Sequence, residues 1–193
     1  MRAGTPSLSR GSARHAVLFY RAGDELAGQV SAYLFEALRE GGVALVIATP
    51  AHRNAIARPL VQAGVDVPAA QAAGALVLRD ARETMDRFMI ADWPSPANFW
   101  QVISPLVRKP TETGKPVHVY GEMVALLWDA GLVNSAIEVE AMWNEIAAQY
   151  PFSLLCAYPA DGVRDEVFQD ALAEVCRSHG AVYGELPGHT GRA

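Results

Sequence analysis

The chain has 193 residues, of which 51% are hydrophobic and 19% charged, a composition typical of one compact domain and not of a disordered chain. Its formal net charge of −5 excludes a global attraction to nucleic acid or to an anionic membrane. No apolar run reaches the roughly 18 residues that a membrane span needs.

The first half of the chain alternates uniformly apolar runs with amphipathic ones. Apolar runs of this kind are typical of parallel strands that are buried on both faces. Gly41 and Gly42 mark a helix end, and Thr49 and Pro50 mark a helix start. The expected elements are a strand at 16–20, a helix at 25–39, a strand at 43–48, a helix at 51–63 and a strand at 75–79.

The second half continues the alternation. The expected elements are helices at 82–90 and 97–109 separated by a breaker run at 92–96, a strand at 117–120, helices at 122–130 and 134–149, a strand at 152–158, a helix at 164–178 and a short strand at 181–183. Strands that alternate with helices predict an α/β fold, a three-layer, doubly wound and mainly parallel sheet.

The termini differ in composition from the rest of the chain. Residues 1–14 lack the apolar stretch of a signal peptide, so we expect a disordered lead-in there and a disordered tail at 186–193. A single domain over 15–185 remains. Cys156 and Cys176 form no CxxC motif and are interpreted as thiols of a reducing cytosol, which predicts a cytoplasmic protein.

The segment from Tyr20 to Gly28 follows the first strand, where a nucleotide hydrolase would carry its phosphate-binding loop. It contains no GK[ST] motif. Such a loop wraps phosphates with glycine N–H groups and places a lysine on them. Asp24 and Glu25 lead into the helix instead, and their carboxylates would repel a triphosphate. The pattern indicates a sensor and not an ATPase.

Residues that directly follow the strands could ring one pocket, because ligands of open parallel sheets bind beyond the carboxyl ends of the strands. The alternative is that polar residues stand there only because loops begin there. The candidates are Tyr20, Arg21, Thr49, His52, Asp80, Tyr120, Glu122 and Tyr158.

Glu122 is the most suggestive of these candidates. Gly121 before it would permit a sharp turn that aims the carboxylate at the crevice. Equally, Glu122 could stand in the first turn of the next helix, where the helix dipole favours it.

Glu140, Trp143 and Asn144 fall at i, i+3 and i+4 and share one helix face. This face could contribute to a ligand site or, more commonly for such a tryptophan, belong to the core.

No motif supports metal binding or covalent catalysis. The five histidines include no HExxH and no i, i+4 pair, so a metal site would need residues from distant segments. His15 and His179 each precede an expected strand, which favours structural roles at the sheet end opposite the crevice. GxSxG is also absent. We therefore expect no metal, no cofactor and no catalytic residue.

Two resemblances emerge from longer tracts. Residues 32–48 and 76–80 resemble the RecA/KaiC-type ATPase core that follows the P-loop. More specifically, the chain resembles the MEDS family, the sensory domain of DcmR-type regulators. The motifs that carry this resemblance are His15-x4-Tyr20, Tyr120-Gly-Glu-Met-Val124 with Leu127-Trp128, Glu140-x2-Trp143-Asn144, and Leu155-Cys-Ala-Tyr158 followed by His179.

The resemblance implies a RecA/KaiC-like fold without a P-loop that senses small organic or hydrocarbon-derived molecules. Family members stand beside DNA-binding, histidine-kinase or anti-sigma outputs, which implies a role in transcription regulation. Because we see no room for such an output here, we expect signalling to a regulatory protein partner, with homodimerisation left open and no direct contact with nucleic acid or membrane.

Two other functions compete with ligand sensing. One is a degenerate NTPase or a hydrolase that uses Glu122 as general base with Asp80 near it. The other is a pure protein-interaction module whose crevice is filled by its own aromatic side chains.

Overall fold

The computed structural model describes residues 14–160 and 166–184, without the side chains of residues 24 and 166–168. The expected lead-in, apart from Arg14, and the expected tail lie outside the described residues. Six parallel strands form one sheet in the order β3-β2-β6-β7-β1-β8. They are β1 (His15–Tyr20), β2 (Val43–Ala48), β3 (Leu76–Asp80), β6 (Val117–Gly121), β7 (Ser153–Pro159) and β8 (Ala181–Gly184).

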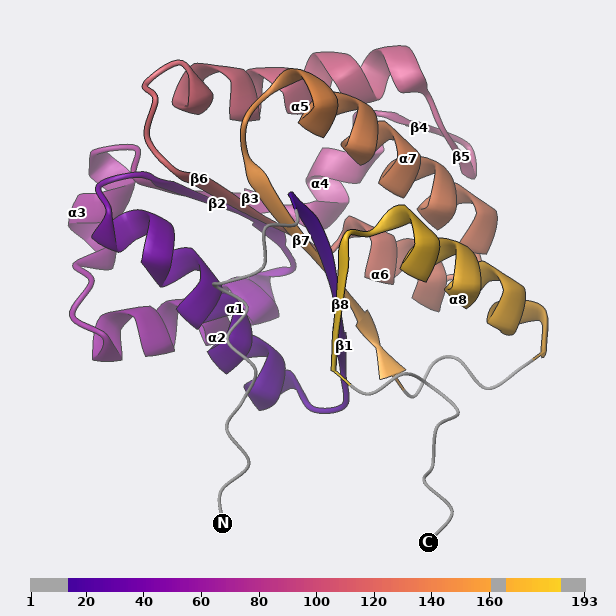
Figure 1. Cartoon of the computed structure of the whole chain (residues 1–193), viewed down its shortest axis with the longest axis horizontal. Coiled ribbons are helices and arrows are strands. Elements are labelled where there is room, and N and C mark those ends of the chain that lie inside the picture. The colour runs from indigo at the N-terminus through magenta and orange to yellow at the C-terminus, as the bar shows by residue number, and fades with distance from the viewer. Residues whose placement is uncertain (1–13, 161–165, 185–193) are drawn as a thin grey trace, which may run out of the picture.

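Helices cover both faces of the sheet (Figure 1). One face carries α1 (Gly23–Arg39), α2 (Pro50–Gln62) and α3 (Val67–Ala72). The other carries α4 (Ala81–Asp86), α5 (Pro96–Thr111), α6 (Met123–Asp129), α7 (Val133–Gln149) and α8 (Glu166–Ser178). This arrangement confirms the expected three-layer α/β fold.

Strand alternation explains the two cores. Val17 and Phe19 of β1 pack in the α4–α8 layer, whereas Ala16 and Leu18 pack in the α1–α3 layer, because successive strand side chains point to opposite faces. The four side chains are almost fully buried. Both faces of the strand therefore need apolar residues, which gives the uniformly apolar runs of the sequence.

Two local expectations were incomplete or wrong. The helix expected at 82–90 ends at Asp86, and the chain then forms a short antiparallel hairpin of β4 (Met89–Ile90) and β5 (Trp93–Pro94). Helix α3 was not expected; its N-cap Asp66 accepts a hydrogen bond from the main-chain N of Ala69 at 2.9 Å. None of the helices in the described ranges is both long and apolar enough to cross a membrane.

Gly42 lies at a close approach between the α1–β2 connection and the residue before β6. A Cβ built on Gly42 would stand 2.1 Å from the main-chain oxygen of Pro116, which accepts a hydrogen bond from Val43. Neither backbone segment can move without breaking this hydrogen bond at the start of the β2–β6 pairing. Glycine is therefore required here for space.

We expect Gly42→Ala to lower the free energy of unfolding by about 3 kcal/mol, because the new methyl group overlaps backbone atoms. Urea denaturation measures this loss. Gly28→Ala is the matched control: Gly28 is exposed in α1 with no atom within 4 Å of its would-be Cβ, so alanine should stabilise the helix by about 0.5–1 kcal/mol. Equal midpoints for the two variants would contradict the steric argument.

Candidate functional site

The connection from β1 to α1 consists of Arg21 and Ala22 alone, because α1 begins at Gly23, two residues earlier than expected. Most of the segment interpreted as a loop, Tyr20 to Gly28, is therefore helix. A phosphate-wrapping loop needs several consecutive residues with N–H groups aimed at the ligand. A two-residue connection cannot supply them.

Glu122 joins the carboxyl end of β6 to the start of α2. Its Oε2 accepts a hydrogen bond from the main-chain N of Thr49 at 2.9 Å, and its Oε1 lies 2.7 Å from Nδ1 of His52. The Thr49 hydroxyl lies 3.4 Å from both carboxylate oxygens. Glu122 is almost fully buried. Its carboxylate thus anchors the N-terminus of α2.

The backbone around Glu122 places it at the junction of β6 and α6. Gly121 is the last residue of β6 and has no positive φ, so the chain makes no left-handed glycine turn there. Glu122 occupies the N-cap position of α6, but its side chain makes no capping bond there. The carboxylate reaches across to the neighbouring strand end instead, where Thr49 is the expected N-cap of α2 and Pro50 its first residue.

Asp80 also holds α2, from the other neighbour of β2. Its Oδ2 accepts a hydrogen bond from the Arg53 guanidinium at 3.0 Å, and its Oδ1 accepts from the main-chain N of Arg82 at 2.9 Å. Asp80 therefore links α2 and α4 to the end of β3.

Burial and the negative charge of Glu122 raise the pKa of two nearby tyrosines, Tyr20 and Tyr120. Burial, Glu122 and Asp129 raise the pKa of Tyr20 to about 12, so its half-buried phenol is neutral at physiological pH. Burial and Glu122 likewise raise the pKa of Asp129. Tyr120 is fully buried, and its hydroxyl finds no hydrogen-bond partner among the described residues.

His52 is partly accessible, with 26% of its side chain exposed. The hydrogen bond to Glu122 is the largest cause that raises the pKa of His52 above 6.5, and it outweighs the opposing effect of burial. The Nε2 atom lies 3.9 Å from the position that a Cβ on Gly23 would take. Nε2 therefore faces the start of α1.

Several other predicted residues lie in the interior or at the surface. Trp143 is fully buried in the α4–α8 layer, and Arg21 is exposed in the β1–α1 connection. The Tyr158 hydroxyl donates to Oε1 of Glu140 at 2.8 Å in the interior. The structure therefore does not bring the eleven predicted residues together at one pocket.

Sequence reasoning missed a second cluster, which we call the buried tetrad: His15, Glu140, Cys156 and His179. One potential ligand atom from each of these buried residues lies within 4.8 Å of the others. Burial opposes the charge of Glu140, but His179 and His15 outweigh it and hold the pKa of the carboxyl well below its usual range. Burial opposes the charge of His179 too, but Glu140 outweighs it and raises the pKa.

Strand order explains why the tetrad was missed. His15 opens β1, and His179 precedes β8, the edge strand beside β1. The two imidazole centroids are 4.0 Å apart. The sequence showed that each histidine precedes a strand, but only the adjacency of β1 and β8 brings them together.

Comparison with known proteins adds the family and the fold. The family model of the methanogen/methylotroph DcmR sensory domain, MEDS, matches residues 14–179. The chain belongs to the MEDS family. Comparison with curated proteins returns no match.

Among solved structures, this MEDS domain is similar to an uncharacterized protein from Pyrococcus horikoshii in complex with an unknown peptide. The TM-score is 0.58 at 15% sequence identity, and the match covers 90% of this chain and 77% of the other. At this identity the likeness shows the fold alone.

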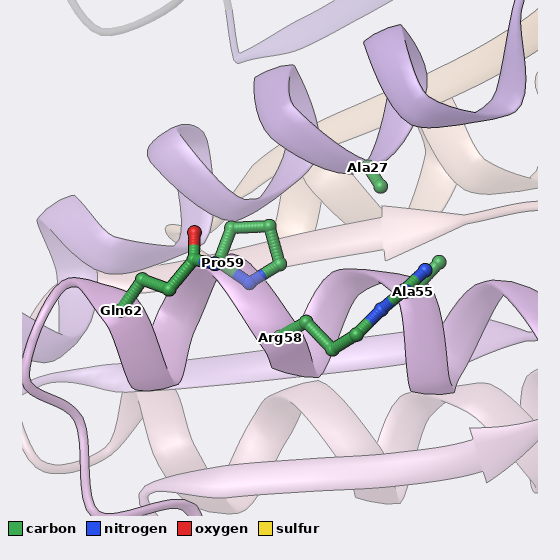
Figure 2. Close-up of a pocket in the computed structure, with 5 residues that line it drawn as sticks. All are labelled: Ala27, Ala55, Arg58, Pro59 and Gln62. Atoms are coloured by element: carbon green, nitrogen blue, oxygen red, sulfur yellow. The ribbon is translucent and has the colours of Figure 1, made fainter.

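The MEDS domain also has an open hollow of about 240 Å³ between α1 and α2 (Figure 2). It lies further along α2 than His52 and contains none of the predicted residues. Its lining residues are Ala27, Ala55, Arg58, Pro59 and Gln62.

The His52–Glu122 contact should make stability depend on pH. Because the folded pKa of His52 is raised, protonated His52 stabilises the MEDS domain fully below about pH 6.5, its unfolded value, and this contribution is lost as pH rises through the raised pKa. We expect the difference in unfolding free energy between wild type and His52→Gln to be largest on the acidic side. Urea denaturation across this pH range measures it.

Glu122→Gln provides the control for this pH dependence. It removes the charge that raises the pKa of His52, so the cost of replacing His52 in that background should no longer be larger on the acidic side, since burial alone lowers this pKa. A wild-type difference that stays constant with pH would contradict the ion-pair assignment.

Proposed function

We propose that this MEDS domain senses a small organic molecule beside His52 and Tyr20 and passes its bound state to a regulatory protein partner of the kinase, anti-sigma or transcription-factor type. Membership of a sensory family supports a sensing role. The observation that carries the location is the partly exposed His52, whose Nδ1 is held by Glu122 while its Nε2 faces the start of α1.

The groups at this position favour an oxygen-bearing, uncharged or weakly anionic ligand. Protonated His52 presents an Nε2–H donor, and the neutral phenol of Tyr20 presents an O–H donor. The first turn of α1 contributes main-chain N–H groups that have no partner within the helix. A triphosphate does not suit the site, because the two-residue connection supplies no phosphate loop.

Ligand binding has a direct route to the rest of the domain. Glu122 joins β6 to Thr49 and His52, so a ligand that shifts His52 acts on the bonds that hold the α2 N-terminus. Asp80 and Arg53 hold the same helix from β3. Movement of α2 relative to the sheet is the structural change that a partner would read.

A variant that fills the space beside His52 tests the proposed ligand site. Gly23→Leu should fill the region in front of Nε2, because even a Cβ at this exposed position stands 3.9 Å from that atom. Ligands that bind only the folded state raise its melting temperature. In a panel of short alcohols, aldehydes, ketones and carboxylic acids, we expect at least one compound to raise the melting temperature of wild type and to have no effect on Gly23→Leu.

Gly28→Ala is the matched control in the same helix and should keep the full ligand response, since nothing lies within 4 Å of its would-be Cβ. The proposed site is wrong if an active compound stabilises Gly23→Leu as much as wild type. A panel that never shifts the wild-type melting temperature, in the absence or presence of cell extract, would count against small-molecule sensing itself.

A further inference from the structure

The buried tetrad lies away from the proposed ligand site, in the layer between the sheet and α7. Its members come from β1, α7, β7 and the residue that follows α8. Their exposed fractions are 4% for His15, 1% for Glu140, 0% for Cys156 and 8% for His179. We infer that the tetrad binds one divalent transition-metal ion of the zinc class through two imidazoles, one thiolate and one carboxylate.

Four of the distances between the ligand atoms lie close to those of a tetrahedral ion, and every pair lies within 4.8 Å. Zinc bonds of about 2.0–2.3 Å place the corners of a tetrahedron roughly 3.3–3.7 Å apart. The Glu140 Oε2 atom lies 3.2 Å from Nε2 of His15, 3.2 Å from Sγ of Cys156 and 3.5 Å from Nε2 of His179. His15 Nε2 and Cys156 Sγ are 3.3 Å apart. Direct ion-pair hydrogen bonds between nitrogen and oxygen are shorter, about 2.7–2.9 Å.

Each histidine of the tetrad uses Nδ1 for a hydrogen bond outside the tetrad, which directs the lone pair of Nε2 toward the other members. The Asn144 amide nitrogen donates to the carbonyl of Ser178 at 3.1 Å, so its oxygen faces Nδ1 of His15 at 2.9 Å. That oxygen can only accept, which places the proton on Nδ1. Hydrogen bonds of this kind, from the non-ligating nitrogen, are typical of metal-binding histidines.

His179 follows the same pattern and gives an independent indication of a ligand. Its Nδ1 donates to the carbonyl of Val175 at 2.6 Å. Its side chain is 0% exposed, and Nε2 makes no hydrogen bond among the described residues; its ion-pair contact with Oε2 of Glu140 is long, at 3.5 Å. A buried polar atom left in this state is costly, and a metal ion at the centre of the tetrad would satisfy it.

Charge balance favours a divalent ion. Tyr158 occupies Oε1 of Glu140, which leaves Oε2 for the metal. Binding releases to solvent the Cys156 thiol proton and any proton on Nε2 of His15 or His179, and bonds from the metal to sulfur and nitrogen take their place. The resulting thiolate and carboxylate together neutralise a 2+ ion, while both imidazoles are neutral. Because four protein side chains fill the coordination sphere, the ion would have a structural or regulatory role and no open position for substrate.

Cobalt substitution tests this inference directly. We expect metal-free, full-length protein to bind about one Co²⁺ per chain, with the intense d–d bands of a tetrahedral ion and a thiolate-to-cobalt charge-transfer band. Zn²⁺ should abolish these bands by displacement and should raise the melting temperature of the metal-free protein.

The two cysteines provide a matched pair. Cys156→Ser should lose the charge-transfer band completely, whereas Cys176→Ser should keep it, because Cys176 lies outside the tetrad. Circular dichroism of the metal-free variants checks that each is folded. Glu140→Gln is the second variant, and it should keep the band but bind Co²⁺ at least tenfold more weakly.

Two results would overturn the metal site. One is wild-type protein that takes up no stoichiometric Co²⁺ or Zn²⁺, which would make the tetrad a protonated charge network. The other is a charge-transfer band that survives in Cys156→Ser. Neither result bears on the compound panel or on Gly23→Leu, so the ligand site and the metal site fail separately.

Discussion

The buried carboxylate of Glu140 imposes the strongest constraint on this fold. A charge removed from water costs several kcal/mol unless partners surround it. Here His15, His179 and Tyr158 supply those partners from β1, the β8 approach and β7. These contacts tie helix α7 to β1, to β7 and to the residue before β8. The same contacts place the ligand atoms of the buried tetrad around one point.

At the carboxyl edge of the sheet, two acidic residues hold one helix in place. Glu122 and Asp80 stand at the ends of β6 and β3, on either side of β2. Their oxygens hold α2 through Thr49, His52 and Arg53. In a nucleotide enzyme, strand-end acids serve metal and water. Here they make the position of α2 depend on His52, a partly exposed histidine. This arrangement suits a sensor.

The two proposed sites differ in chemistry because they differ in solvent access. His52 is partly exposed, so a ligand can enter and leave, and its pKa responds to one nearby carboxylate. The tetrad is almost closed to water, which suits an ion that stays bound. Strand β1 joins them, with His15 at its amino end and Tyr20 at its carboxyl end. A change at either end therefore acts on the same strand.

Local sequence determined most of the helices and strands, because apolar periodicity, glycine ends and caps act over a few residues. The sequence also placed Thr49, His52 and Glu122 just beyond strand ends. The absence of a GK[ST] motif remains its most informative feature. The sequence missed the hairpin after Asp86. Only the tertiary structure decided that Glu140 and Tyr158 face the interior and that His15 meets His179. The physical reason is that strand order is set by long-range packing of both sheet faces, which no short window of sequence contains.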